Sequence, residues 1–205
     1  ITGSTHKTFP GPQHGILISD SKDDEFLKKL RSRIFPGVVS NHHLHAMAAL
    51  GIAMAEWLAF GEAYARQIVK NSRALAEALH AEGFKVLGEK NGFTRSHQVA
   101  VDVRAQGGGA KVSKLFESCN LITNKNMLPQ DRDRSPQDPS GVRVGVQECT
   151  RVGMREGEMK EVAQFMARAA LRGEEPARVR ADVAAFKRSF THVHLCFHGG
   201  FDAYK

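Results

Sequence analysis

"TGSTHKTFPGP", residues 2–12, places Lys7 between a short β-like run and a Pro-Gly-Pro turn. Because the prolines fix φ and the glycine permits a tight turn, we expect a stiff backbone around Lys7. A lysine at a rigid strand end can serve as a Schiff-base nucleophile when desolvation or neighbouring groups lower its pKa. The other side chains of the stretch that could hydrogen-bond a cofactor are Ser4, Thr5, His6 and Thr8. An ordinary surface lysine beside a turn is the alternative, and the motif by itself favours it.

Length and composition are those of an ordinary globular chain. The 205 residues suffice for one domain with a full core or for two small ones. Hydrophobic residues make up 41% and charged residues 25%, which is typical of soluble domains. The most apolar run, 46–60, is interrupted by Glu56, so the sequence predicts no membrane-spanning segment. No secretion signal is expected either.

Cysteine usage and charge suggest a compartment and a class of ligand. Cys119, Cys149 and Cys196 form no CxxC pair, which predicts a reducing, cytoplasmic location. The formal net charge is +7, and a basic chain can bind nucleic acid. Basic and acidic residues are interleaved over 154–188, and only two Tyr and one Trp are present, so we expect no nucleic-acid partner. A basic enzyme that attracts anionic ligands explains the charge equally well.

The spacing of apolar residues predicts alternating helices and strands, and therefore an α/β layer structure. Helices are expected at 23–35, from Ser40 or Asn41 to Glu82 with a bend at Phe60-Gly61, within 107–120, at about 155–172 and at 176–189. Strands are expected at 15–19, 84–88, 97–104, 121–123 and 142–146. Three regions follow: 1–60 as the end of a larger domain, 61–172 as a small α/β domain, and 173–205 as a helical tail with a terminal strand.

Four ordered motifs resemble the serine hydroxymethyltransferase family of pyridoxal-phosphate (PLP) enzymes, in its archaeal-type branch. They are TGSTHKTFPGP at 2–12, IFPG with His45, NKNMLP at 124–129, and PSGVRVG at 139–145 followed by TRVGM. The similarity runs from residue 2 to about residue 170, and the related threonine transaldolases are the next most similar proteins. The resemblance implies an α/β chain of PLP-dependent transferase fold type I (aspartate-aminotransferase-like). It would hold an incomplete large domain followed by a C-terminal small α/β domain.

The resemblance also implies roles for individual residues. Lys7 would hold PLP covalently, and Arg143 would bind the carboxylate of the amino acid through two parallel charge-assisted bonds. Asn126 would face the folate. The positions expected to bind the cofactor are Ser4, Thr5, His6, Lys7, Ser40 and Asn41. At Ser40 and Asn41 the family has two glycines, and backbone N–H groups at a helix start bind phosphate whatever their side chains are.

The implied reaction is hydroxymethyl transfer between serine and glycine, with tetrahydrofolate as co-substrate, in a homodimer. Gln13 stands where the family has arginine, so a PLP-dependent threonine transaldolase or aldolase is the alternative. The family's first half, which supplies the aspartate for the pyridine nitrogen and most of the phosphate cup, has no counterpart in these 205 residues. We therefore interpret the chain as the later half of the enzyme and expect it to be inactive alone. A non-catalytic fragment that pairs with a partner is the second alternative.

The C-terminal stretch THVHLCFHGG, residues 191–200, suggests a further site. In a strand, every second side chain lies on one face, and imidazole and thiolate together suit zinc. The residues concerned are His192, His194, Cys196 and His198. Ligands at i and i+2 rarely complete a tetrahedral site, and a partly buried terminal strand is the alternative. No metal site is therefore predicted here or at the histidines of 42–45.

Overall fold

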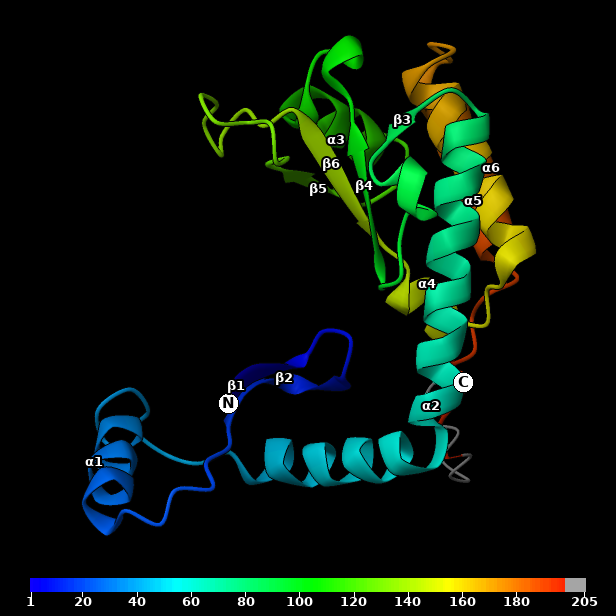
Figure 1. Cartoon of the computed structure of the whole chain (residues 1–205). Coiled ribbons are helices and arrows are strands. Elements are labelled where there is room, and N and C mark those ends of the chain that lie inside the picture. The colour runs from blue at the N-terminus through cyan, green and yellow to red at the C-terminus, as the bar shows by residue number, and fades with distance from the viewer. Residues whose placement is uncertain (198–205) are drawn as a thin grey trace. The chain divides into compact units, whose positions relative to one another are not determined.

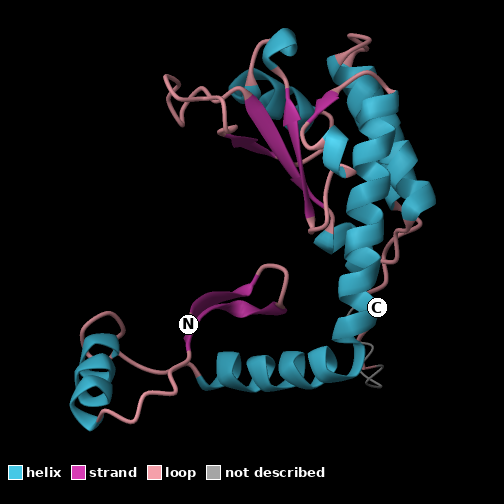
Figure 2. Cartoon of the chain, in the orientation of Figure 1, coloured by secondary structure: helices cyan, strands magenta, loops and turns pink. Residues whose placement is uncertain are grey.

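The computed structural model describes residues 1–197, which fall into two compact units (Figures 1 and 2). The first unit is Ile1–Gly61, and the second unit begins at Glu62. The division of the sequence into three regions, with 173–205 as a separate tail, stays a prediction.

The first unit opens with an antiparallel hairpin of β1 (Thr2–His6) and β2 (Pro10–Leu17). The strand expected at 15–19 is instead 10–17, because its backbone pairs with β1 from Pro10 opposite His6 to Leu17 opposite Thr2, with one shift of register between Ser4 and His6. Helix α1 (Asp24–Ile34) lies within the predicted range. The side chain of Asp23 caps it by accepting a hydrogen bond from the Phe26 N–H at 3.0 Å, which satisfies one of the free donors of the first turn.

Helix α2 (Leu44–Ala81) is continuous and joins the two units. The prediction that it begins at Ser40 or Asn41 is wrong. The Asn41 side chain instead accepts a hydrogen bond from the next N–H, that of His42, which holds a bend ahead of the helix. The expected bend at Phe60-Gly61 does not break the helix, although the boundary between the units falls there. Glycine at 61 makes room for Trp57, whose indole would lie 2.9 Å from an added Cβ.

By length and composition alone, α2 is the one helix among the described residues that is long and apolar enough to cross a membrane. The sequence analysis expected no such segment because Glu56 interrupts the apolar run. One such helix is weak evidence for a membrane span, since the core helix of a soluble protein meets the same criteria.

The second unit contains an antiparallel sheet in the order β3-β4-β6-β5. Its strands are β3 (Lys85–Val86), β4 (Gln98–Asp102), β5 (Asn124–Asn126) and β6 (Gly141–Gly145). The strand predicted at 121–123 is wrong, and the edge strand is the polar stretch that follows it. The apolar residues of 121–123 suggested a buried strand, but Ile122 is 79% exposed. The strand instead contains Lys125, which pairs with Val142 of β6.

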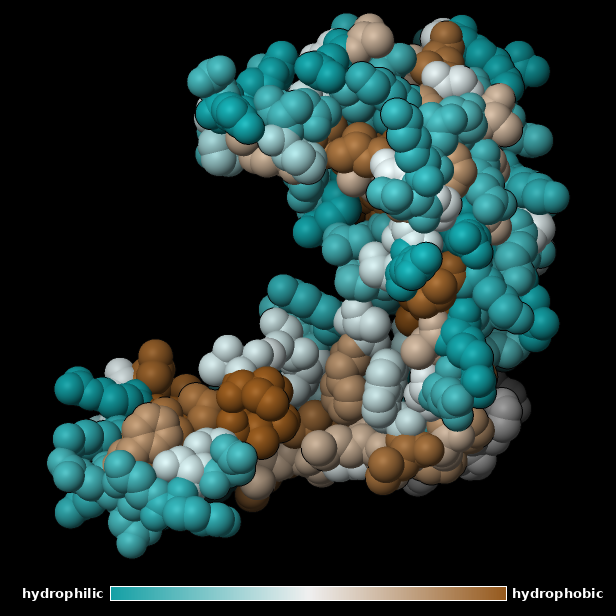
Figure 3. Space-filling model, viewed as in Figure 1, coloured by the Kyte–Doolittle hydropathy of each residue, from teal (hydrophilic) through white to brown (hydrophobic). Residues whose placement is uncertain are grey.

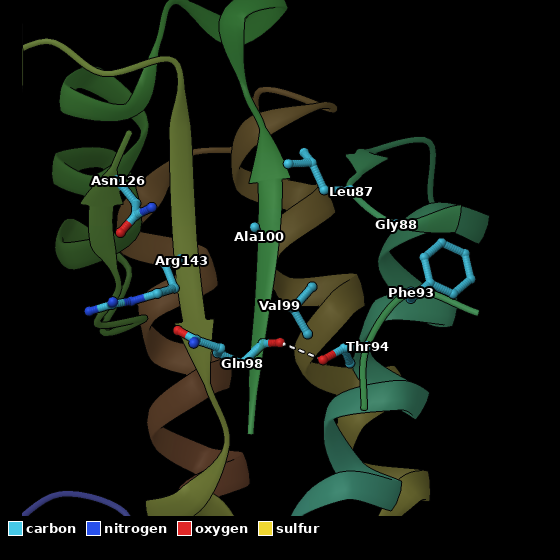
Figure 4. A pocket seen from close by; sticks show the side chains of 9 residues that line it. All are labelled: Leu87, Gly88, Phe93, Thr94, Gln98, Val99, Ala100, Asn126 and Arg143. Carbon is cyan, nitrogen blue, oxygen red and sulfur yellow. Dashed lines mark hydrogen bonds between the residues drawn. The ribbon is translucent and has the colours of Figure 1, made fainter. Parts of the chain in front are cut away.

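The sheet has one buried face and one open face. Val99, Val101, Val142 and Val144 are buried, and the residues between them belong to the other face. Helix α3 (Gly109–Ser118) contacts β5, β6, α5 (Glu156–Ala170) and α6 (Pro176–Lys187), and Figure 4 shows helices behind the sheet. Alternation along β4 and β6 thus turns every second side chain away from the helices.

Buried polar groups connect α2 to the segment after β6. Asn71, fully buried, donates from Nδ2 to the Thr150 hydroxyl and to the Met154 carbonyl, both at 2.8 Å. The Tyr64 hydroxyl donates to the Gln147 carbonyl at 3.0 Å. Helix α4 (Gln147–Arg151), which these bonds hold, is five residues long, and the sequence analysis missed it because it is too short to show a period.

The terminal strand predicted within 191–200 is absent from the described part of that stretch. Residues 191–197 form bends and coil, with the His194 N–H donating to the Arg151 carbonyl at 2.8 Å. His198 lies outside the described residues. Residues 1–197 contain no group of three or more His, Cys, Asp or Glu side chains placed to hold a metal.

The first unit has almost no apolar core of its own. Its only described buried hydrophobic residues are Ala46 and Ala53, and α1 buries no residue at all. Figure 3 shows apolar side chains gathered on the surface of this unit. The large exposed ones include Phe26, Ile34, Phe35, Ile52 and Leu58. An apolar surface of this kind marks an interaction surface.

This difference predicts unequal protection from amide hydrogen exchange within the chain. Amides of α1 are expected to exchange much faster than those of α5, because local opening of α1 exposes no buried side chain. Exchange followed by mass spectrometry of peptides from each helix tests this. Equal protection of α1 and α5 would contradict it.

Asp102, the last residue of β4, interacts with two basic side chains, those of Arg104 and Lys85. Its carboxylate accepts from Arg104 Nε at 3.0 Å and Nη2 at 2.6 Å, and lies 3.3 Å from the Lys85 ammonium. The Arg104 guanidinium outweighs the opposing effect of burial and holds the pKa of Asp102 at about 2, below its ordinary 3.8. The folded state therefore favours the ionised carboxyl.

Asp102→Asn is expected to lower the free energy of unfolding by about 1–2 kcal/mol at neutral pH. This range allows for solvent screening, since the Lys85 and Arg104 side chains are 73% and 46% exposed. Because the pKa is lower in the folded state, the contribution is present above pH 4 and is lost as the pH falls towards 2. Urea unfolding followed by circular dichroism tests this against Glu161→Gln, an exposed acid. If the difference in unfolding free energy between the wild type and Asp102→Asn grew as the pH fell, the lowered pKa of Asp102 would be contradicted.

Candidate functional site

Lys7 lies in the loop 7–9 that joins β1 and β2, and it is exposed. Within the described part of the chain it has no hydrogen bond or ion pair, so its amine is available to a ligand. The Phe9 ring lies 5.6 Å from the Trp57 ring, which fastens the loop to α2. A Cβ at Gly11 in β2 would lie 2.7 Å from the Thr5 carbonyl oxygen, so this close approach of the two strands requires glycine. These contacts agree with the stiff backbone expected from the sequence.

The neighbours of Lys7 in β1 differ in what they offer a ligand. Thr5 is buried, and its hydroxyl donates inside the hairpin to the Pro12 carbonyl at 2.6 Å. His6 is exposed, with Nδ1 3.4 Å from the His14 carbonyl oxygen, and Ser4 is half-buried. Thr5 therefore holds the hairpin together, whereas His6 presents its ring to solvent.

Ser40 and Asn41 are exposed in the segment between α1 and α2. They precede the first residue of α2 and so do not lie at its N-terminal turn. If Ser40 and Asn41 contact the cofactor phosphate as predicted, they do so without the free N–H groups of the first turn of α2.

In the second unit, Arg143 and Asn126 line one cavity of about 370 Å³ on the open face of the sheet (Figure 4). Arg143 stands on the central strand β6, opposite Ala100 on one side and Asn124 on the other. The small side chain of Ala100 leaves space beside the guanidinium. The remaining lining residues are Leu87, Gly88, Phe93, Thr94, Gln98 and Val99.

The polar groups of this cavity suit an anionic ligand. Arg143 is exposed, and no acid among residues 1–197 pairs with it. Asn126 donates from Nδ2 to the Met127 carbonyl at 2.6 Å, which leaves its amide oxygen as an acceptor. A guanidinium without a counter-ion beside an amide oxygen can bind a carboxylate and accept a hydrogen bond from the same or a second ligand.

A strained turn forms one wall of the cavity. Phe93 has φ 65°, a left-handed conformation that is rare for a bulky residue, and its N–H donates to the Gly88 carbonyl at 2.8 Å. Gly88 has φ 82°, and a side chain there would collide with the Phe93 carbonyl. The Thr94 hydroxyl donates to the Gln98 carbonyl at 3.0 Å, as Figure 4 shows. Strained backbone of this kind persists where the surrounding structure holds it, often at functional sites.

The sequence analysis missed Phe93, Thr94 and Gln98. Of these three, only Gln98 could have been found from the sequence. It alternates with valines along the strand and so lies on the same face as Ala100. The predicted residues form two groups. Lys7, Ser4, Thr5, His6, Ser40 and Asn41 belong to the first unit, and Asn126 and Arg143 share a cavity in the second.

Comparison with known proteins places this geometry in a family. The family model described as serine hydroxymethyltransferase matches residues 1–166. The chain is 54% identical over 204 residues to a serine hydroxymethyltransferase of Thermoplasma acidophilum, covering 100% of this chain and 47% of that protein. A Pyrococcus horikoshii serine hydroxymethyltransferase is also 54% identical, over 98% of this chain and 48% of its own length. The chain thus spans about half the length of the curated relatives it matches.

A solved structure agrees with these sequence matches. The L-threonine transaldolase of Pseudomonas fluorescens, in its internal aldimine state, superposes with a TM-score of 0.83 at 31% identity. The match covers 98% of this chain and 45% of the transaldolase. The predicted fold class, α/β of PLP-dependent transferase fold type I, is confirmed. On these matches, the chain belongs to the serine hydroxymethyltransferase family.

Proposed function

We propose that the enzyme containing this chain transfers a hydroxymethyl group between serine and glycine, with tetrahydrofolate as co-substrate. One observation carries the proposal beyond family membership. The exposed guanidinium of Arg143, without a counter-ion among the described residues, lines a cavity together with Asn126. Such a cavity suits an amino acid, whose carboxylate would neutralise the arginine.

The residues of the first unit fit PLP as cofactor. Lys7 presents an amine that has no hydrogen bond or ion pair among residues 1–197, and His6 beside it is exposed. We propose that Lys7 holds PLP covalently, with Ser4 and His6 beside it, while Thr5 fixes the hairpin that carries them. The segment of Ser40 and Asn41 would contact the phosphate. When bound, PLP withdraws electrons from the α-carbon of the amino acid, which makes cleavage of a bond to that carbon possible.

Arg143 and Asn126 supply orientation in this proposal. The planar guanidinium forms two parallel charge-assisted bonds to a carboxylate, which fixes the direction of the remaining bonds at the α-carbon. The Asn126 amide oxygen is available to accept a hydrogen bond from an N–H of the folate, since its nitrogen already donates to Met127. One side chain thus selects the amino acid, and the other contacts the acceptor.

Threonine transaldolase is the second candidate, because an L-threonine transaldolase is among the solved structures that match the chain, at 31% identity. Identities of 51–54% to serine hydroxymethyltransferases favour hydroxymethyl transfer. The two are separated by offering the enzyme serine with tetrahydrofolate, or threonine with an added aldehyde. Turnover only with threonine and the aldehyde would replace the main proposal by the alternative.

We further propose that the whole enzyme, with the family's first half present, is a cytoplasmic homodimer. The three cysteines are all free, as expected in a reducing compartment. The exposed apolar side chains of the first unit provide an association surface. A sedimentation experiment that found only monomers at micromolar concentration would argue against the dimer.

If Lys7 holds PLP, borohydride reduction after incubation with PLP should fix the cofactor on the peptide that contains Lys7. Lys7→Ala is expected to remove this labelled peptide, because no other amine occupies the loop. Lys22→Ala, which alters an exposed lysine of the same unit, serves as control and should label as the wild type does. Equal labelling of Lys7→Ala and Lys22→Ala would mean nonspecific reaction and would contradict the assignment.

If Arg143 binds the carboxylate, Arg143→Lys should weaken glycine binding to the chain by about tenfold, because an ammonium cannot form the two parallel bonds. Glycine-induced shifts of the Arg143 Nε–H signal and of the β6 amides in NMR spectra measure this. Arg132→Lys, on the exposed loop before β6, is the matched control. Unchanged affinity in Arg143→Lys would exclude the guanidinium as the carboxylate site.

A further inference from the structure

Asn126 and Arg143, which both line the cavity, lie near opposite ends of one long loop. Asn126 is the last residue of β5, and β6 begins at Gly141, two residues before Arg143. Strand β5 has only three residues and lies at the edge of the sheet, so its few backbone pairs hold it weakly. Something else must keep the loop 127–140 in one conformation if Asn126 and Arg143 are to act on one ligand.

Asp131 connects the two ends of this loop. It is buried, with 7% of its surface exposed, and Oδ2 accepts from the Leu128 N–H at 3.0 Å and from the Ser140 N–H at 2.9 Å. Its other oxygen, Oδ1, accepts from the Ser140 hydroxyl. One carboxylate therefore holds the backbone two residues after Asn126 and the backbone directly before Gly141.

Close packing surrounds the same bonds. Leu128 is buried, and a side chain on Gly141 would lie 2.5 Å from it, so only glycine lets the two segments approach. The Gly109 N–H at the start of α3 donates to the Pro139 carbonyl at 2.8 Å. The loop ends are thus fixed to each other by Asp131 and to α3 by Pro139.

The protonation state of Asp131 supports this arrangement. Burial raises the pKa of its carboxyl, but hydrogen bonds from Ser140 and from the backbone of Leu128 act in the opposite direction, so the pKa lies below the ordinary value. The group is an ionised acceptor at neutral pH. A buried carboxylate stabilises a fold poorly compared with apolar packing, so its presence here calls for a role in specifying geometry.

We propose that Asp131 is a positioning residue. Its carboxylate holds both ends of the loop 127–140, so that Asn126 and Arg143 can bind the same ligand in their shared cavity. The inference rests on the proposed function, since that function defines the ligand as an amino acid with its co-substrate. Asp131 itself does not line the cavity, so its effect passes through the backbone at Leu128 and Ser140.

The test compares Asp131→Asn with Asp133→Asn, an exposed acid of the same loop that makes no hydrogen bond or ion pair among the described residues. The amide nitrogen of asparagine cannot accept, so Asp131→Asn loses acceptors while keeping its size. Amides of Leu128, Ser140 and β5 are expected to exchange faster with solvent, while those of β4 stay protected. Glycine binding, followed at Arg143 by NMR, should weaken at least about tenfold. Asp133→Asn should match the wild type in both measurements.

Ser140→Ala serves where Asp131→Asn fails to fold, because it removes one of the three bonds and leaves both backbone bonds in place. Ser140→Ala is expected to lose less glycine affinity than Asp131→Asn, and its amide hydrogen exchange should be faster at residue 140. Unchanged glycine binding in the variant that folds would overturn the proposal, even if the loop exchanged faster. If glycine binds no version of the chain, the assignment of Arg143 as a carboxylate site that works in this chain alone fails. Exchange at β5 then decides the role of Asp131: faster exchange in the variant supports it, and equal exchange refutes it.

Discussion

Burial of one face of the second unit's sheet is the constraint on which the candidate site depends. Val142 and Val144 have to face the helices, because leaving them in water would forfeit roughly 2 kcal/mol each. A strand alternates its side chains, so Arg143 between them has to face the other way. The guanidinium therefore reaches the open side of the sheet without any specific contact to direct it. A shift of one residue in register would bury the arginine and expose the valines, which makes the register strongly determined.

The first unit follows a different logic, since it holds few buried apolar side chains. Its order is local: prolines, a required glycine and the Thr5 hydroxyl shape the hairpin, and the Phe9–Trp57 contact attaches the loop to α2. The unit presents Lys7 rigidly but lacks a core of its own. The proposed cofactor lysine and the exposed apolar side chains thus both belong to the first unit, whereas most of the buried apolar residues belong to the second.

The fold class and most helices could be predicted from the sequence, whereas the roles of the two groups of candidate residues stay predictions. Sequence reasoning succeeded where the local spacing of apolar residues decides, as at α1 and β4, which lie within the ranges expected at 23–35 and 97–104. It failed where long-range pairing decides: the edge strand is 124–126 because it meets β6, and the more apolar 121–123 is not a strand. The role of Asp131 was equally invisible, because one acid in a charged loop looks like its exposed neighbour Asp133. Only the fold shows which of them accepts bonds from both loop ends.

The central claim is that the open face of the sheet presents Arg143 as a carboxylate site. A crystal structure of the chain grown with glycine tests this most directly. We expect the two carboxylate oxygens of glycine about 3 Å from two nitrogens of the Arg143 guanidinium, in the cavity shared with Asn126. The two nitrogens would be either Nη1 and Nη2, or Nε and one Nη. Glycine bound elsewhere, or an acid of the chain paired with Arg143, would contradict it.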